Sequence, residues 1–145
     1  MKKFLLFLFS TTIVFVASAQ NNSENPLIKF DTTTHDFGKF LEGKIVSYEF
    51  VFSNVGKAPL ILGNVQPSCG CTTPEWPREP IMPGQKSTIK AVYNPGAYKG
   101  TFSKGITVSS NASNGNVQLV IKGTVLEKPV EPVSPIKTYA PEGGF

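Results

Sequence analysis

With 145 residues, the chain is long enough for one domain with an ordinary core and too short for two such domains. The chain has 14 lysines and arginines and 10 acidic residues, so its formal net charge is only +4. The lysines after residue 19 are scattered singly. Proteins that bind nucleic acids concentrate positive charge on one face, so we do not expect nucleic acid as a partner.

The first 19 residues have the features of a secretory signal peptide. Lys2 and Lys3 supply positive charge, residues 4–16 are mostly apolar, and Ala17-Ser18-Ala19 is a small-residue cleavage pattern. The apolar run is shorter than the roughly 20 residues of a membrane span, so we expect no stable membrane insertion after cleavage. Cleavage after Ala19 leaves Gln20 first, and no cysteine stands there for lipidation. These features predict a periplasmic or secreted protein.

Alternation of apolar and polar side chains predicts β-strands, because successive side chains of a strand point to opposite faces. The alternation is clearest over residues 44–54, and it recurs near 86–93, 101–109 and 117–125. Weaker strand candidates cover 27–31, 34–37 and 59–65, which makes about seven strands. The inward faces predict a core of Val46, Tyr48, Phe50, Phe52, Ile89, Ala91, Tyr93, Ile106, Val108, Leu119 and Ile121.

Glycine, proline and asparagine cluster between these segments, where turns are expected. Gly38 and Gly43 are expected to bracket one turn, and Asn114-Gly115 is expected to form a hairpin turn between the last two strands. No segment after residue 19 shows an apolar 3.6-residue period over three turns, so the predicted class is all-β. About seven short strands in roughly 100 residues favour an immunoglobulin-like sandwich of two sheets over a closed barrel.

The predicted organisation has four parts. Residues 1–19 form the signal peptide, 20–26 a flexible N-terminal segment, 27–126 the sandwich domain, and 127–145 a flexible tail. Pro129, Pro132, Pro135 and Pro141 interrupt the tail. Proline has no backbone donor for a sheet interior, so the tail is expected to be extended.

Cys69-Gly70-Cys71 is the sharpest local motif of the sequence. Two cysteines in an exported protein first suggest a disulfide. Residues i and i+2 of a straight strand lie about 6.6 Å apart, at the long edge of the disulfide range, so the chain would have to fold inward at Gly70. The small ring would be strained and easily reduced. A disulfide, a free dithiol and a metal thiolate pair all stay open.

As a metal site, the two thiolates would suit Cu(I) better than zinc, which normally takes four ligands. His35, the single histidine, and Met82 are the further ligands of suitable softness, but nothing in the sequence brings them near. A tight turn pinned by the cysteine pair is therefore favoured, and no cofactor is expected. His35 beside Asp36 does not predict a catalytic pair, because neighbours on a strand point to opposite faces.

Several motifs occur in a fixed order along the chain. They are His35-Asp36-Phe37-Gly38, Phe52-x-Asn54-x-Gly56, Pro59-Leu60, Ser68-Cys69-Gly70-Cys71-Thr72, Pro83-Gly84, Gly100-x-Phe102 and Ser110-Asn111. This set resembles the exported bacterial family of the domain of unknown function 1573 (DUF1573), roughly from Ile28 to Val125. The resemblance implies an immunoglobulin-like sandwich related to hydin-like and major-sperm-protein-like domains, which are binding modules. It implies no established function.

The expected function is a non-enzymatic binding or scaffolding module of the bacterial cell envelope. Its expected partner is another envelope protein, and the candidate binding residues are Cys69, Gly70, Cys71 and His35. No Gly-x-Ser-x-Gly, His-Glu-x-x-His or Cys-x-x-Cys motif occurs that would indicate a known catalytic site. The alternative is a thiol- or copper-handling protein that acts through Cys69 and Cys71.

Overall fold

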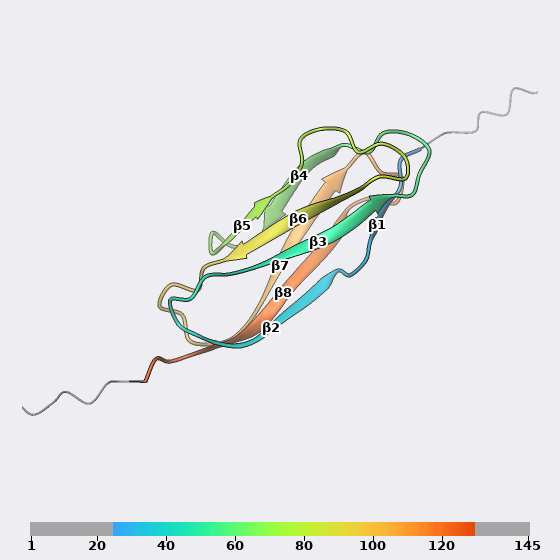
Figure 1. The fold of residues 1–145 in the computed structure, drawn as a ribbon. Coiled ribbons are helices and arrows are strands. Elements are labelled where there is room, and N and C mark those ends of the chain that lie inside the picture. The colour runs from blue at the N-terminus through green and yellow to red at the C-terminus, as the bar shows by residue number, and fades with distance from the viewer. Residues whose placement is uncertain (1–24, 130–145) are drawn as a thin grey trace, which may run out of the picture.

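A computed structural model describes residues 25–129 as two four-stranded sheets that pack face to face (Figure 1). The first sheet has the order β1 (Ile28–Phe30), β3 (Val46–Asn54), β6 (Lys86–Tyr93) and β5 (Thr72–Glu75). The second has the order β2 (Thr34–Leu41), β8 (Val117–Leu126), β7 (Gly100–Ser110) and β4 (Leu62–Pro67). The signal peptide and most of the N-terminal segment and the tail lie outside the described residues.

The predicted fold class is confirmed, because residues 25–129 form an all-β sandwich. Neighbouring strands are antiparallel except β2 and β8, which pair in parallel. Within this range no helix is long and apolar enough to cross a membrane. All seven expected segments contain strands, and the structure adds an eighth, β5. Its sequence Thr-Thr-Pro-Glu has no alternation, and its proline is tolerated because β5 lies at a sheet edge.

The core lies between the sheets and contains most of the expected residues. Nine of the eleven are buried: Phe50, Phe52, Ile89, Ala91, Tyr93, Ile106, Val108, Leu119 and Ile121. Val46 and Tyr48 are only partly buried, and they pack against the edge of the same cluster. Val46 begins β3 at an open end of the sandwich, and Tyr48 stacks on the ring of His35 at a centroid distance of 3.6 Å.

The expectation that Gly38 begins a turn was wrong. Strand β2 continues through this residue to Leu41, and its pairing with β8 shifts register between Asp36 and Lys39. Gly38 has a φ of 65°, and its backbone N–H donates to the Asp36 carboxylate at 2.8 Å. The glycine therefore forms a β-bulge, a feature that uses the same left-handed conformation as many turns. The expected hairpin between β7 and β8 is present, with Gly115 at a φ of 76°.

Candidate functional site

The Cys69-Gly70-Cys71 segment forms a turn where the chain crosses from one sheet to the other. It connects β4, an edge strand of the second sheet, to β5, an edge strand of the first (Figure 1). The structure has a disulfide between Cys69 and Cys71, with their Cα atoms 5.3 Å apart. This separation is shorter than the ~6.6 Å of a straight strand, because the chain bends at this point.

Hydrogen bonds hold the turn to both sheets. The Ser68 N–H donates to the carbonyl of Gly105 on β7 at 2.9 Å, and the Gly105 N–H donates back to Ser68 Oγ at 3.1 Å. On the other side, the Asn94 N–H just after β6 donates to the Cys71 carbonyl at 2.9 Å. None of these three bonds involves a sulfur atom, so the backbone of the turn has anchors that are independent of the disulfide.

The two sulfur atoms have different surroundings. Both cysteines are partly buried, and Cys71 packs against the hydrophobic core. Cys69 Sγ lies 3.8 Å from the hydroxyl of Thr72, a side chain that is only 3% exposed. Gly70 between them is exposed, and a Cβ atom added there would meet no atom within 4 Å beyond its two chain neighbours. The tip of the turn is therefore open to solvent.

His35 does not lie near the cysteine pair. It sits on β2, at the opposite edge of the second sheet from β4, with β8 and β7 between them. Its ring stacks on Tyr48 and meets Phe37 edge-on at a centroid distance of 4.7 Å, so it takes part in aromatic packing. The neighbouring Asp36 points to the other face, where it pairs with Lys122 at 3.8 Å. As expected for neighbours in a strand, the two side chains therefore lie on opposite faces.

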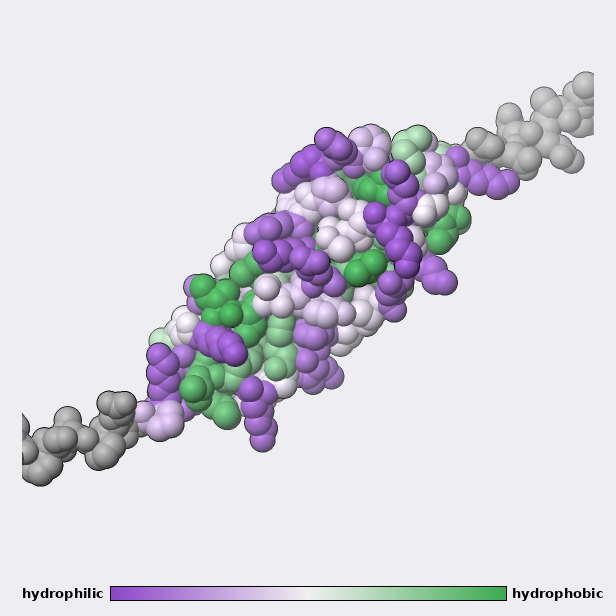
Figure 2. All heavy atoms as spheres, in the orientation of Figure 1, coloured by the Kyte–Doolittle hydropathy of each residue, from purple (hydrophilic) through white to green (hydrophobic). Residues whose placement is uncertain are grey.

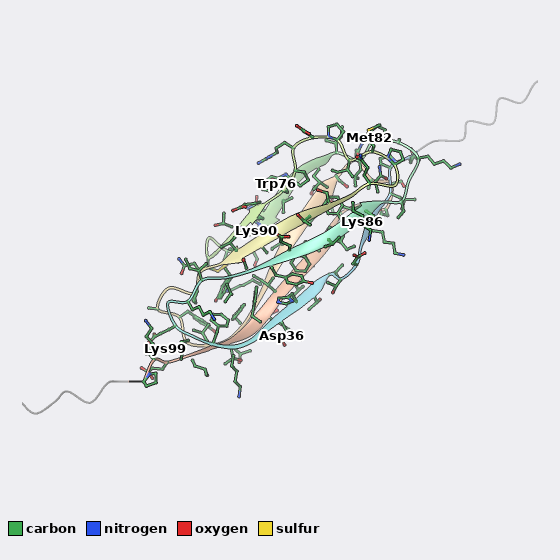
Figure 3. All side chains as sticks on the ribbon, in the orientation of Figure 1. Asp36, Trp76, Met82, Lys86, Lys90 and Lys99 are labelled. Carbon is green, nitrogen blue, oxygen red and sulfur yellow. A yellow bond between two sulfur atoms is a disulfide. The ribbon has the colours of Figure 1, made fainter. Side chains whose placement is uncertain are left out.

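Met82 is also remote from the turn, because it precedes β6 at the end of the sandwich where β3 finishes (Figure 3). Among residues 25–129, no three or more His, Cys, Asp or Glu side chains gather so that they could hold a metal ion. The turn therefore has two sulfur atoms, and neither His35 nor Met82, the two further ligands considered from the sequence, lies near them.

Other residues of the ordered motifs have structural roles. Asn54 is fully buried, and its amide Nδ2 donates to the carbonyls of Ala58 and Ile81 at 2.8 and 2.9 Å. Its Oδ1 accepts from the Gly56 N–H at 3.0 Å. This one side chain therefore joins the end of β3 to two loops, and its polar atoms are satisfied inside the fold.

Gly56 and Asn111 serve the same end of the sandwich. A Cβ atom at Gly56 would lie 2.4 Å from the carbonyl oxygen of Asn25, closer than any side chain can approach. The Asn111 side chain accepts from the Ile61 N–H at 2.8 Å and donates to the Pro59 carbonyl at 3.1 Å. These motif residues hold the fold together, whereas the cysteine turn carries the two sulfur atoms of the candidate site.

Two exposed hydrophobic surfaces were not anticipated from the sequence. Among residues 25–129, eight large hydrophobic side chains are 38–58% exposed, and all lie near the ends of the strands. Figure 2 shows hydrophobic residues gathered toward the lower-left end of the face in view. The Ile45 end consists of Leu41, Ile45, Tyr98 and Leu126. The Val55 end consists of Leu27, Val55, Ile61 and Met82. Met82 and Lys99, which follows Tyr98, mark these opposite ends in Figure 3.

Charged groups surround the Ile45 end. Lys99 pairs with Glu127 and, at 3.7 Å, with Glu42. The hydrogen bond to Glu127, assisted by the charges of both carboxylates, raises the pKa of Lys99. A hollow of about 380 Å³ lies beside these groups and is lined by residues 39–44 and Lys128. This end therefore combines exposed apolar side chains, a hollow and fixed charges.

Solved structures share the fold of this chain. A protein of unknown function from Porphyromonas gingivalis W83 is 20% identical with a TM-score of 0.63, over 73% of this chain and 50% of that one. The ASH / PapD-like domain 7 of human CEP192 is 9% identical with a TM-score of 0.59, over 89% and 99%. The secreted serine protease VesC from Vibrio cholerae is 16% identical with a TM-score of 0.54, over 69% and 23%.

At these identities the likeness shows the fold alone. The matched region is half of the Porphyromonas protein and about a quarter of VesC, whereas it is nearly the whole of the CEP192 domain. The PapD-like domain agrees with the immunoglobulin-like relationship that the ordered motifs implied. No curated protein matches the sequence.

A family model described as "Protein of unknown function (DUF1573)" matches residues 28–125. These are the residues over which the ordered motifs resemble that family, so the resemblance is confirmed. The match covers more than half of the 145 residues, and the chain therefore belongs to the DUF1573 family.

Proposed function

We propose that this chain is an exported, non-enzymatic binding or scaffolding module of the bacterial cell envelope, with another envelope protein as its partner. The observation that carries the proposal is the gathering of exposed hydrophobic side chains at the two ends of the sandwich. Single exposed hydrophobic residues are normal on a protein surface, whereas groups of them mark interaction sites. End loops held on a rigid β-scaffold are also common positions for binding residues.

The Ile45 end shows how the scaffold builds such a surface. Leu41 at the end of β2 and Leu126 at the end of β8 are register partners, so their side chains lie next to each other on the outer face. They are 42% and 41% exposed, and the Glu42 N–H holds the two strand ends together through the Leu126 carbonyl at 2.8 Å. Full burial of one such side chain by a partner would contribute about 1.5–3 kcal/mol.

The placement of the single histidine supports a non-enzymatic role. His35 lies between the rings of Phe37 and Tyr48, where it contributes to packing. Its neighbour Asp36 forms an ion pair on the opposite face. The stacked and edge-on contacts of the ring with Tyr48 and Phe37 favour a structural use of His35.

Affinity capture from cell envelopes, with chemical crosslinking and the full-length gene product as bait, tests the proposal. The variants are Ile45→Asp and Val55→Asp, one at each end, and the matched control is Thr107→Asp on the exposed face of β7. Wild type and control should capture the same envelope protein, and at least one end variant should lose roughly tenfold in recovery, as expected for about 1.4 kcal/mol of lost burial. Equal recovery with all variants, or no captured protein, would contradict it.

A further inference from the structure

We propose that Cys69 and Cys71 form a redox-active pair that exchanges its disulfide with the cysteine thiols of a protein partner. This activity goes beyond binding at the two ends and depends on different residues. The turn lies where the chain crosses from β4 to β5, far from the Val55 end. Tyr93 pairs with both Thr72 and Val46, so the turn lies at the same end of the first sheet as Ile45, with β6 between β5 and β3. The proposal rests on four observations about this turn, which concern its anchors, its loop length, its exposure and its hydroxyl neighbour.

The anchors of the turn allow the disulfide to open without loss of the fold. The bonds between Ser68 and Gly105 hold one side, and the bond from Asn94 to the Cys71 carbonyl holds the other. All of them use backbone atoms or a serine hydroxyl. Both cysteines should therefore keep their positions after reduction. The two thiols then stay close enough to form the disulfide again without a rearrangement of the backbone.

The disulfide has little to do as a structural link. It closes a loop between residues only two apart in sequence, whereas structural disulfides join distant segments. Loop closure removes less freedom from an unfolded chain when the loop is short. The neighbouring strands are in any case joined by backbone pairing of β4 with β7 and of β5 with β6.

The tip of the turn is exposed at Gly70. This residue is exposed, its φ is not in the left-handed region, and an added Cβ would meet no other part of residues 25–129 within 4 Å except its chain neighbours. The backbone conformation alone thus does not require glycine here. An incoming side chain can approach the tip of the turn at Gly70, and the two cysteines beside it are partly buried, with Cys71 packed against the core.

Thr72 distinguishes the two sulfur atoms. Its hydroxyl lies 3.8 Å from Cys69 Sγ, and a disulfide sulfur carries no hydrogen, so the hydroxyl is the donor. The same donor would stabilise a Cys69 thiolate, because hydrogen bonds to charged groups are the stronger ones. A thiolate that is better stabilised leaves faster. Thr72 is therefore a positioning residue that makes Cys69 the leaving sulfur and Cys71 the attacked one.

The exchange then runs in two balanced steps. In the first step, a partner thiolate attacks Cys71 Sγ and forms a mixed disulfide between the partner sulfur and the Cys71 sulfur. The Cys69–Cys71 bond breaks, and Cys69 leaves as a thiolate. A second partner thiolate attacks the partner sulfur of this mixed disulfide, forms the partner's own disulfide and releases Cys71 as a thiolate. The partner loses two electrons, the pair gains them, and the two thiolates take up the two protons that the partner thiols gave up.

Equilibration of the full-length protein with glutathione buffers of increasing reduced fraction tests whether the pair is redox-active. Trapping with an alkylating reagent and mass measurement counts the thiols, and circular dichroism follows the sheets. The expected result is reversible appearance of two thiols with unchanged β-sheet signal. A synthetic peptide with two cysteines, used as the probe partner, should be oxidised in a one-to-one ratio. A folded protein that stays oxidised in every buffer, or thiols that appear only on unfolding, would overturn the proposal.

The assignment of Cys69 as leaving sulfur is tested with Thr72→Val, which removes the hydroxyl and keeps the shape. The equilibrium constant for reduction should fall about three- to tenfold, because one hydrogen bond to a thiolate is lost. Thr72→Ser, which restores a hydroxyl, and Thr73→Val, on the exposed side of β5, should behave as wild type. Unchanged reduction of Thr72→Val would overturn the assignment. Val55→Asp, at the end of the sandwich remote from the turn, should exchange normally with the synthetic peptide, which separates this activity from binding at that end.

Discussion

At the scale of single residues, Phe50 shows what holds the two sheets together. Its side chain is fully buried, and its ring meets the ring of Tyr48 edge-on at 4.9 Å. Glu49, the next residue of β3, points to solvent. We expect Phe50→Ala to lower the free energy of unfolding by about 3–5 kcal/mol and Glu49→Ala to change it by less than about 0.5. Urea melts of both variants check this, and small equal losses would refute the register of β3.

Gly56 is required for a close approach of two backbone segments. A Cβ atom there would lie 2.4 Å from both the Asn25 carbonyl oxygen and the Leu27 nitrogen, so the segment before β1 would have to move. Gly56→Ala should therefore cost about 2 kcal/mol or more. Gly63→Ala is the matched control, since its Cβ would be 3.7 Å from the nearest atom, and it should stay within about 1 kcal/mol. Thermal melts that rank the two variants the other way would contradict this reading.

The cysteine pair should matter little for stability. By the chain-entropy relation, closing a loop of three residues contributes only about 1.6 kcal/mol, against about 3 for a loop of 15. We expect the double variant Cys69→Ser, Cys71→Ser to remain folded with a modest drop in melting temperature, similar to the drop of wild type in reductant. Melts of the three samples side by side give the answer, and a double variant that fails to fold would show the pair to be structural.

At the scale of elements, the alternation of apolar and polar residues predicts those strands that have one buried face and one solvent-exposed face. Strands β3, β6, β7 and β8 lie within two residues of their expected limits, because each has at least three apolar side chains that are buried in the core or packed against it. Strand β5 could not be predicted in this way, since it is four residues long and its pairing with β6 decides its conformation. Gly38 was misread because a bulge and a turn need the same positive φ.

The candidate site was only partly predictable from the sequence. The sequence identified Cys69-Gly70-Cys71 as a candidate site, because the residue type and the spacing of two cysteines are enough to suggest a disulfide or a metal site. The hydroxyl of Thr72 next to Cys69 Sγ depends on how the turn bends, which spacing does not give. The Ile45 end was not predictable, because Leu41 and Leu126 become neighbours only through the parallel pairing of two strands far apart in the chain.

At the scale of the whole molecule, the two end surfaces are well separated. Strand β8 has ten residues and runs toward the Ile45 end, so at roughly 3.3 Å per residue the ends are about 30 Å apart. A partner of ordinary size that covers one end would leave the other free. This separation suits a scaffolding role, in which one module contacts two neighbours at once.

Export remains a prediction of the first 19 residues, which lie outside the described part of the chain. We expect protein recovered from the cell envelope to begin at Gln20, because Ala17-Ser18-Ala19 provides the small residues that signal peptidase requires. N-terminal sequencing or intact mass measurement of the envelope fraction checks the cleavage site. Recovery of the protein with Met1 in place would contradict it.

The most direct test of binding through the ends is site-specific photocrosslinking in living cells. A photoreactive amino acid replaces Ile45, Val55 or, as control, Thr107, which faces solvent within a sheet. If the ends bind envelope partners, illumination should give discrete crosslinked bands of defined mass at position 45, position 55 or both, and none at position 107. Crosslinks only at position 107, or the same faint ladder at all three positions, would contradict the account.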